Sequence, residues 1–575
     1  MKVNEKKTNL IFSRNTKQLS KKYSNILIGE WLLSSNIKKN YSYKVSKYHW
    51  TKKEKRLKGY KFVKKIYKKI LKNLILYLNK YHETNYNNRY WRIIVNHFLL
   101  HYIFFIYDRW KMVEDIKKKN QLSRVKVFSY PKNFFIQNSS NDFFKILKSN
   151  EWNDWIFSEI IREFNIPNSK IKVIKKNKIE FKSSNSNLTS LKFKYLLSIK
   201  NKNDYFIKSL EMPRLEKLKL HFLLRQIFFK YNDLKLDNFK VTKKRFKLNI
   251  FKKTRSKFEN FLAKKLQQML PMSFLEGYKD IIKNLKYLNW PNDPKIIITS
   301  YDHCFNDPFK IYTANKTMND SKLFLFQHGN EGFLNHYDQK ICDKYFSWGN
   351  KSKDKINYPM FVSTTVGKKI KKKNPKGILI SITEFPTIPT GQYAHPRDFS
   401  TTKIYRDNLI IFLSKLNKKF LKLSTVKTHT AGWDLFTTND IRSKFTNLKV
   451  KVFSKINTRV FEDSVNFNLV VETTNSTGFL ESLNLNIPVI LFTPKNFFSV
   501  KKEYLKFYKL LENEGIIFFN ATKAANFINK NYDNLDEWWN SKKLQNNRKI
   551  FCENICRSRK NPSLFLAQSL KKLSN

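Results

Sequence analysis

Short apolar runs alternate with longer amphipathic segments along the C-terminal part of the chain. Strands are expected at 377–383, 426–429, 448–453, 469–473, 488–492 and 516–519. Helices are expected between several of them, at 402–423, 476–485 and 502–513. Short apolar strands that alternate with amphipathic helices are typical of a parallel sheet covered on both faces. We therefore predict a Rossmann-like α/β domain over residues 377–575.

The N-terminal half shows the same strand signal at fewer places. Apolar runs of strand type lie at 25–30, 295–300, 323–327 and 345–348. Between about 126 and 270 the sequence is rich in Lys, Asn and Ser and has weak periodicity, which favours a mostly helical elaboration. The charged stretch 368–376 is expected to be a linker. The prediction is an α/β protein with a first domain over 1–367, and a cleft between the two Rossmann-like domains.

Two helices are expected before this region. Residues 61–81 carry apolar side chains at helical spacing and lysines on the other face. This pattern suits either a core helix with a solvated face or a helix that docks on anionic lipid headgroups. Residues 90–115 are apolar nearly all round, as in an interior helix. Arg89, Arg92, Asp108 and Arg109 there would form salt bridges that fix helix ends or, alternatively, part of an acceptor site.

The charge is strongly positive. Lys and Arg number 112 against 45 Asp and Glu, which gives a formal net charge of +67. Coding in an AT-rich genome, an anionic membrane surface or polyanionic ligand, and nucleic acid are the three explanations. Only 18 of the 112 are Arg, whereas proteins that read bases prefer Arg. We therefore do not expect nucleic acid as the partner and leave an anionic membrane surface open.

Several classes of protein are not expected. The four cysteines show no CxxC spacing, so neither a zinc site nor a disulfide framework is predicted. The first twenty residues contain no apolar signal segment, and the longest apolar run, 98–107, is about half of a membrane span. These features favour a cytoplasmic protein, with peripheral attachment to the inner face of the membrane as an alternative.

The strongest local motif follows the expected strand 469–473. Polar residues end the strand and begin a helix: Thr473, Thr474, Asn475, Ser476 and Thr477. The crevice of an open α/β sheet lies at the carboxyl ends of its strands, and a helix N-terminus binds anions. The motif therefore suits a phosphate or diphosphate, with Glu481 one turn later facing a ribose or glycerol hydroxyl. The alternative is a plain N-cap with a surface glutamate.

Two further strand ends carry polar residues. Gln327, His328 and Gly329 follow one strand, and His328 there could act as a general base or bind a phosphate oxygen. Lys427 and His429 alternate along another strand end and could neutralise a pyrophosphate, although both could instead face solvent. No acidic pair stands out at a strand end, so we expect neither a bound metal nor another cofactor.

These residues give the chain a resemblance to a family of transferases from bacterial surface-polysaccharide and O-antigen gene clusters. The similarity extends over nearly the whole sequence. It includes Gly29-Glu30-Trp31, Tyr48-His49-Trp50, Arg89-Tyr90-Trp91-Arg92, Asp108-Arg109-Trp110, Gln327-His328-Gly329, Trp348-Gly349, Gly432-Trp433-Asp434, Asn475-Ser476-Thr477, Phe479-Leu480-Glu481, Asn486-Ile487-Pro488, Glu514-Gly515-Ile516 and Trp538-Trp539.

More distantly, the strand-end motifs resemble those of CDP-glycerol glycerophosphotransferases, which have the GT-B architecture. The resemblance implies a nucleotide-activated donor in the C-terminal domain and a base, His328, from the N-terminal domain. Thr430 stands where those enzymes have proline, and Glu481 stands where they have aspartate. Asn96-His97 stands where the closer family tends to have Gly-Pro. These departures affect donor identity more than fold.

The resulting prediction is a metal-independent GT-B-like transferase that moves a glycosyl group from a nucleotide sugar to a cell-surface glycan or lipid-linked acceptor. His328 and Gln327 would be catalytic. Gly329, Lys427, His429, residues 473–477 and Glu481 would bind the donor. The acceptor side would include Glu30, His49, Arg89, Arg92 and Glu331. The alternatives are a glycerophosphotransferase that uses CDP-glycerol and a non-catalytic scaffold that binds polyanions or membranes.

Overall fold

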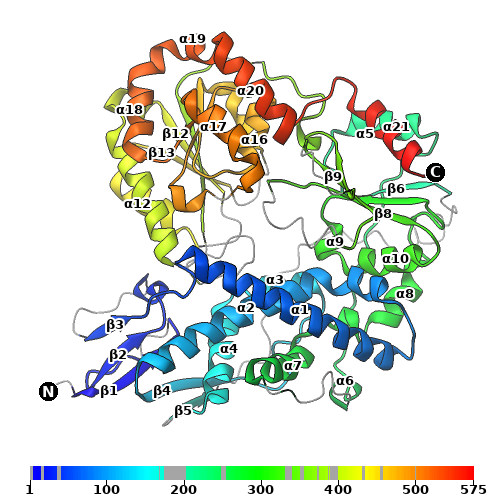
Figure 1. Cartoon of the computed structure of the whole chain (residues 1–575), viewed down its shortest axis with the longest axis vertical. Coiled ribbons are helices and arrows are strands. Elements are labelled where there is room, and N and C mark those ends of the chain that lie inside the picture. Colours follow the sequence, from blue (N-terminus) through cyan, green and yellow to red (C-terminus); the bar gives the residue numbers. More distant parts are fainter. Residues whose placement is uncertain are drawn as a thin grey trace.

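The chain forms three separate parallel sheets, which we name A, B and C in chain order (Figure 1). The predicted α/β class is confirmed, and the number of sheets exceeds the two that we predicted. The computed structural model describes residues 4–14, 18–34, 41–166, 169–173, 202–247, 254, 256–330, 340–349, 355–371, 374–385, 388, 399–429, 434–453, 458–498 and 500–574.

Of sheet A, one strand was predicted, at 25–30, and it overlaps the observed strand Tyr23–Leu27. The central strand was not predicted, because it has few apolar residues. The order of sheet A is β3 (Tyr43–Val45), β2 (Tyr23–Leu27), β1 (Asn4–Ile11), β4 (Leu122–Ser129) and β5 (Ser169–Val173). β1 is mostly polar in sequence, and its last two residues, Leu10 and Ile11, are buried in the apolar core. Neighbouring strands β1 and β2 are joined by buried Asn9 and Asn25, whose side chains hydrogen bond at 2.9 Å.

The mostly helical elaboration expected at 126–270 is confirmed, and the region also contributes strands. It contains the second half of β4 and all of β5 and β6 (Tyr205–Ile207), so it contributes to two sheets. Its helices are α3 (Ser140–Ile146), α4 (Asn150–Glu163), α5 (Arg214–Leu223), α6 (Lys244–Lys247) and α7 (Lys257–Met269). Strands this short, set between Lys- and Asn-rich segments, leave little periodicity to recognise.

Sheet B follows the chain without a reversal of order. From one edge it runs β10 (Asn357–Pro359), β9 (Lys344–Ser347), β8 (Lys322–Phe326), β7 (Ile296–Thr299) and β6. The three strands predicted here, β7 to β9, are confirmed. The last described helix, α21 (Pro562–Ser574), returns to this sheet, because Lys322 donates to the carbonyl oxygen of Leu573 at 2.9 Å.

Sheet C confirms the predicted order of strands and helices in the C-terminal part. Its strands are β13 (Lys449–Phe453), β12 (Ser424–His429), β11 (Ile378–Thr383), β14 (Leu469–Glu472), β15 (Val489–Phe492) and β16 (Ile517–Phe518). All neighbouring pairs are parallel. The chain therefore runs outward from β11 to one edge and then restarts at β14. The helix expected at 402–423 is divided into α12 (Phe399–Lys415) and α13 (Lys418–Lys422).

The remaining elements cover the sheets or connect them. They are η2 (Glu30–Ser34), η4 (Met272–Phe274), α8 (Tyr278–Leu285), α9 (Asp302–Phe305), α10 (Asp307–Thr317), η5 (Ser363–Thr365), α14 (Phe436–Lys444), α15 (Val460–Asp463), η6 (Ser464–Asn466), α16 (Thr477–Asn484), η7 (Lys495–Phe497), η8 (Lys502–Tyr504), α17 (Leu505–Asn513), α18 (Ala521–Asn531), η9 (Tyr532–Asn534), α19 (Leu535–Asn540) and α20 (Lys542–Ile555).

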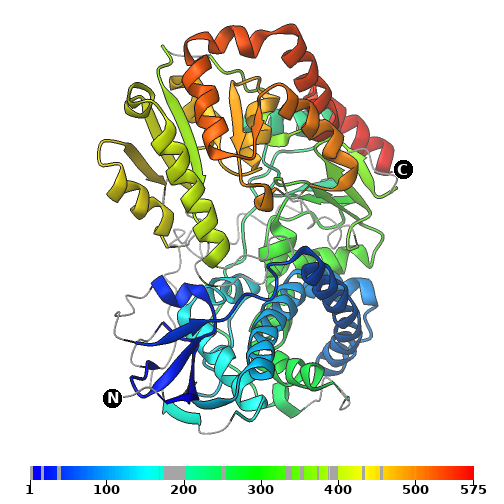
Figure 2. The same cartoon turned by 60° about the vertical axis from the view of Figure 1, so that its left-hand side comes forward.

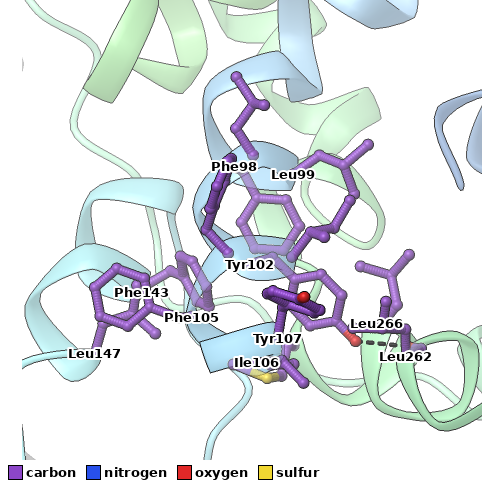
Figure 3. Packing of buried hydrophobic residues seen from close by; sticks show 14 of the residues in the cluster. Phe98, Leu99, Tyr102, Phe105, Ile106, Tyr107, Phe143, Leu147, Leu262 and Leu266 are labelled. Atoms are coloured by element: carbon purple, nitrogen blue, oxygen red, sulfur yellow. Dashed lines mark hydrogen bonds between the residues drawn. The ribbon is translucent and has the colours of Figure 1, made fainter. Parts of the chain in front are cut away.

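Two long helices, α1 (Lys53–His82) and α2 (Asn88–Lys119), lie below sheets B and C in Figures 1 and 2. The predicted interior helix is confirmed, because α2 is buried on all sides along its middle. Figure 3 shows Phe98, Tyr102 and Phe105 of α2 among side chains of α3 and α7, with the Tyr102 hydroxyl donating to the Leu262 carbonyl at 2.5 Å. Among the described helices, none combines the length and the hydrophobicity that a membrane span requires.

Candidate active site

The turn that follows β8 of sheet B contacts the start of α16, the helix that follows β14 of sheet C. The Asn330 backbone N–H donates to Thr477 Oγ1 at 3.2 Å, and the Asn330 side-chain amide donates to the Asn475 carbonyl at 2.8 Å. A Cβ atom at Gly329 would lie 2.6 Å from Thr477 Oγ1, so the close approach requires glycine. Two of the predicted motifs, far apart in the sequence, therefore meet.

Arg459 bridges the two sheets beside this contact. Its Nη1 lies 2.7 Å from Glu481 Oε1, and its Nη2 lies 2.9 Å from Glu211 Oε2. The same Glu211 oxygen is 3.5 Å from His328 Nδ1. Thr364 also donates to Glu481 Oε1. The predicted ribose-binding Glu481 is thus buried and engaged by Arg459 and Thr364, and its ribose role stays a prediction.

His328 has the properties of a general base. Its side chain is 47% exposed, which leaves it accessible from solvent. Burial of the ring lowers its pKa, the positive charges of Arg459 and His303 lower it further, and Glu211 acts in the opposite direction. The imidazole is therefore neutral near pH 7 and can accept a proton.

A neutral carboxyl group lies under the start of α16. Ser476 caps this helix by accepting from the Phe479 N–H, and its hydroxyl donates to Glu472 Oε2 at 3.1 Å. Glu472 is 2% exposed, and burial raises its pKa to about 8, although hydrogen bonds from Ser476 and Ser381 oppose the shift. An anion at the helix N-terminus would thus face a carboxylic acid rather than a carboxylate at neutral pH.

The five residues predicted to cradle a phosphate divide into two groups. Thr473 is buried, and its hydroxyl donates to the Ser381 carbonyl at 2.7 Å, which ties β14 to β11 where the strand order reverses. Thr474, Asn475, Ser476 and Thr477 are half-buried around the helix start. Thr473 is therefore structural in this arrangement, and the other four line the site.

Lys427 and His429 do not share an environment. Lys427 is buried, and its ammonium lies 2.6 Å both from Asp463 Oδ2 and from the Thr458 carbonyl. His429 ends β12 and is exposed to solvent on one side. Partial desolvation of its ring lowers its pKa, and the positive charge of Lys427 lowers the pKa further. The charge of Lys427 is thus neutralised by Asp463, and its contact with a diphosphate remains a prediction.

Gln327 supports the turn that carries His328. Its amide nitrogen donates to the Gly329 carbonyl, and its amide oxygen accepts from the Trp348 N–H, both at 2.8 Å. Both ends of the buried side chain are used within the fold. Gln327 thus holds the turn in place, and a catalytic role for Gln327 or His328 stays a prediction.

The predicted acceptor-side residues are not brought together. His49 is buried and lies 2.9 Å from Asp108 Oδ1, where it belongs to a structural charge cluster. Arg89 pairs with Asp343 at the start of β9. Since α2 rises about 1.5 Å per residue, Arg89 and Asp108 are separated by about 28 Å. The salt-bridge alternative is therefore correct for Arg89, Asp108 and Arg109.

The other acceptor-side predictions have mixed outcomes. Glu30 begins η2 at the carboxyl end of β2 and is half-buried. Arg92 is half-buried on α2 near Lys340, whose pKa is lowered by burial and then by the charge of Arg92. Glu331 lies outside the described residues. An acceptor role for any of the three stays a prediction.

A family model described as LIC12162 family transferase matches residues 8–570. The chain belongs to this family. The predicted transferase class is therefore confirmed, and the LIC12162 family protein is an enzyme. No curated protein matches the sequence.

Several solved structures show distant similarity to this LIC12162 family transferase. TarM matches with 12% identity and a TM-score of 0.31, over 49% of this chain and 54% of the TarM chain. The wall teichoic acid polymerase TagF matches with 10% identity and a TM-score of 0.31, over 49% and 72%. UDP-GlcNAc 2-epimerase from Neisseria meningitidis matches with 11% identity and a TM-score of 0.34, over 78% and 99%. The family assignment depends on the family match alone.

Four residues of the site were missed by sequence reasoning: Glu211, Asn330, Arg459 and Glu472. Glu211 follows β6 in the region that showed no pattern, and Arg459 lies in a polar connection of the C-terminal part. Neither position carries a local signal. Glu472 and Asn330, in contrast, directly adjoin the predicted motifs and could have been found from their places at strand ends.

Proposed function

We propose that this LIC12162 family transferase moves a glycosyl group from a nucleotide-activated sugar to a cell-surface glycan or a lipid-linked acceptor. The observation that carries the proposal is the contact of the His328 turn with the start of α16. α16 follows β14, at which the strand order of sheet C reverses, and ligand crevices of open α/β sheets lie at such reversals. In the proposal, His328 as the base and the start of α16 as the anion site would face each other, as in a GT-B-type mechanism.

The donor diphosphate would bind at the N-terminus of α16. The first N–H groups of the helix, with Ser476 and Thr477, supply hydrogen-bond donors to an anion. Glu472 supports this role because its carboxyl is neutral near pH 7. His429 would donate a hydrogen bond, and Lys427, after exchange of Asp463, would add positive charge. In the proposal no divalent metal or other cofactor is required, because the helix dipole and Lys427 meet the leaving-group charge.

His328 would remove the proton of the acceptor hydroxyl. Its Nδ1 faces Glu211, which favours the tautomer with the proton on Nδ1 and makes Nε2 the basic nitrogen. The acceptor oxygen then attacks the anomeric carbon while the bond to the nucleotide diphosphate breaks. Holding both substrates between sheets B and C contributes through proximity, which is worth up to about 7–11 kcal/mol.

The proposed setting is the cytoplasm, where nucleotide sugars would feed a surface polysaccharide such as O-antigen. Attachment to an anionic membrane surface is part of the proposal. It is supported by the net charge of +67 and by the exposed lysines of α1. A lipid-linked acceptor would be reached from such a surface.

The test is thermal unfolding in the presence of UDP, GDP, dTDP, CMP or CDP, with and without magnesium. A nucleotide at 100 times its Kd stabilises the native state by about 2.7 kcal/mol. A shift with one base supports the proposal. Selectivity for CDP would instead favour the glycerophosphotransferase alternative, and no shift with any nucleotide would contradict both.

Two serine variants locate the binding. Ser476 caps α16, and Ser149 caps α4 beside sheet A in the same way, by accepting from the Trp152 N–H. Ser476→Ala and Ser149→Ala should each cost about 1 kcal/mol of stability. Only Ser476→Ala should reduce the nucleotide-induced shift. An equal reduction in both variants would place the nucleotide elsewhere.

A further inference from the structure

Helix α5 carries an exposed apolar stripe on the outer side of sheet B. Leu215 is 72% exposed, Leu218 39% and Phe222 83%, and their spacing of three and four residues places them on one face. Ile227, just beyond the helix, is 65% exposed. The opposite face of α5 is buried through Leu220 and Leu224. The stripe is therefore a fixed surface of a well-packed helix.

We define the α5 patch as Leu215, Leu218, Phe222 and Ile227 together with Leu564 of the adjoining α21, which is 39% exposed. α21 packs against α5, and Ser563 bonds to both the backbone and the side chain of Glu216. Figure 1 shows α5 and α21 together at the outer edge of the molecule, next to β6. Contiguous apolar surface of this kind marks an interaction site.

The charges around the α5 patch are positive. Arg214, Lys219 and Arg225 on or next to α5 are exposed, as are Arg559 and Lys560 before α21. The acidic residue of α5, Glu216, is paired with Lys219 at 2.9 Å and bonded to Ser563. Large apolar side chains among exposed Lys and Arg are the composition of helices that lie in the interface of anionic bilayers.

We propose that the α5 patch docks the enzyme on a bilayer that contains anionic lipids. Phe222, Leu215 and Ile227 enter the interface, and the flanking arginines and lysines bind the headgroups. The helix adjoins the active site: Glu211, which contacts His328, lies three residues before Arg214. Docking would thus bring the His328 side of the cleft close to a lipid-linked acceptor, and this last step rests on the proposed function.

The lysine face of α1 is the competing surface. Seven exposed or half-exposed lysines follow that helix between Lys58 and Lys72, with Leu57 and Leu76 as exposed leucines. These leucines are 19 residues apart, or about 28 Å along the helix, so they form no common patch. Phe62, which is 39% exposed, adds one more apolar side chain to α1. Binding through α1 would therefore be mainly electrostatic and would weaken strongly in high salt, whereas binding through the α5 patch would retain a larger apolar component.

The experiment is co-sedimentation of the full chain with vesicles of equal parts phosphatidylglycerol and phosphatidylcholine, at low and high salt. The triple variant Leu215→Ser, Phe222→Ser, Ile227→Ser should bind at least about tenfold more weakly than the wild type. The matched control, Leu57→Ser with Leu76→Ser, should bind as the wild type does. Unchanged melting temperature in both variants verifies folding.

Four outcomes would overturn the proposal. They are failure of the wild type to bind these vesicles, unchanged binding of the triple variant, loss of binding in the α1 control alone, and wild-type dimerisation that the triple variant abolishes. The last result would assign the α5 patch to a second copy of the chain. Nucleotide-induced stabilisation is measured on the same variants without vesicles. Vesicle binding through α5 without any nucleotide shift would keep the docking surface and reject the proposed function.

Discussion

Two clusters of charged residues in this protein differ in their burial and in their access to solvent. In the first, the closed cluster, Asp108 and Arg109 of α2 are fully buried and bond to each other at 2.8 Å, with Tyr48 and His49 on the remaining Asp108 oxygen. In the second, the open cluster, Arg459 joins Glu211 and Glu481 across two sheets and is 31% exposed, and His328 next to it is 47% exposed.

The two clusters also differ in whether their charged groups can bind a ligand. In the closed cluster, burial by itself would raise the pKa of Asp108, but the His49 hydrogen bond and the Arg109 charge outweigh it and lower the pKa. Arg109 also bonds to Asn153. Such a set is satisfied internally and fixes the fold. The open cluster is partly exposed to solvent at Arg459 and His328, so these groups can exchange partners when a substrate arrives.

The largest expected effect is a loss of activity on substitution of His328 in the open cluster but not of His49 in the closed cluster. His328→Ala should lower kcat by about 10²–10⁴-fold, the usual contribution of a general base, with little change in stability. His49→Ala is the matched control and should lower the melting temperature while its folded fraction retains kcat. Release of the nucleotide from the donor identified by thermal unfolding measures the rate. Full activity of His328→Ala would refute the catalytic assignment.

The next effect concerns stability alone. Asp108→Ala leaves Arg109 buried without its carboxylate, which should cost about 3–5 kcal/mol of unfolding free energy. Chemical denaturation of the variant and the wild type measures this difference. A loss below about 1 kcal/mol would show that the closed cluster is not structural.

Glu472→Gln should remove a pH dependence. Because the folded-state pKa of Glu472 is raised to about 8, the folded protein holds this proton more tightly than the unfolded chain does. Wild-type stability should therefore fall as pH rises from about 4.3, the unfolded value, to about 8. The variant should match the wild type near pH 5 and exceed it by about 1–3 kcal/mol near pH 9.

Denaturation of both proteins across this pH range tests the prediction. Parallel curves for the two proteins would mean that Glu472 ionises normally. The neutral carboxyl proposed beneath the donor diphosphate would then be absent.

The smallest effects compare one hydroxyl in each cluster. Tyr48→Phe removes the bond to Asp108, and Thr364→Val removes the bond to Glu481. The first should cost about 1.5–3 kcal/mol and the second about 0.5–1.5 kcal/mol, because the partly exposed Arg459 bonds to the same Glu481 oxygen and can readjust, whereas Arg109 is fully buried. Equal costs would contradict the distinction between the clusters.

Sequence reasoning identified sheet C and, in sheet A, only the strand at 25–30, and it missed the Arg459 bridge. The inner strands β14 and β15 of sheet C are short, mostly apolar runs that are fully buried, so local pattern and burial agree there. β1 has no such apolar run. A hydrogen bond between the side chains of Asn9 in β1 and Asn25 in β2 contributes to the pairing of these two strands. Arg459 and Glu211 are 248 residues apart and meet only after sheets B and C have packed together. A contact of that range leaves no trace in local spacing.

Because α21 packs against α5 beside sheet B, this part of the molecule can be completed only near the end of synthesis. α5 and the neighbouring strands emerge from the ribosome long before residues 562–574, yet the helix that packs on them is made near the end. Nascent sheet B therefore waits with an uncovered face while all of sheet C is translated, at about 5–20 residues per second. During that interval the unfinished chain is most accessible to chaperones and most prone to aggregation. A chain released by a ribosome that stalls late in translation would lack α21, and sheet B would stay uncovered.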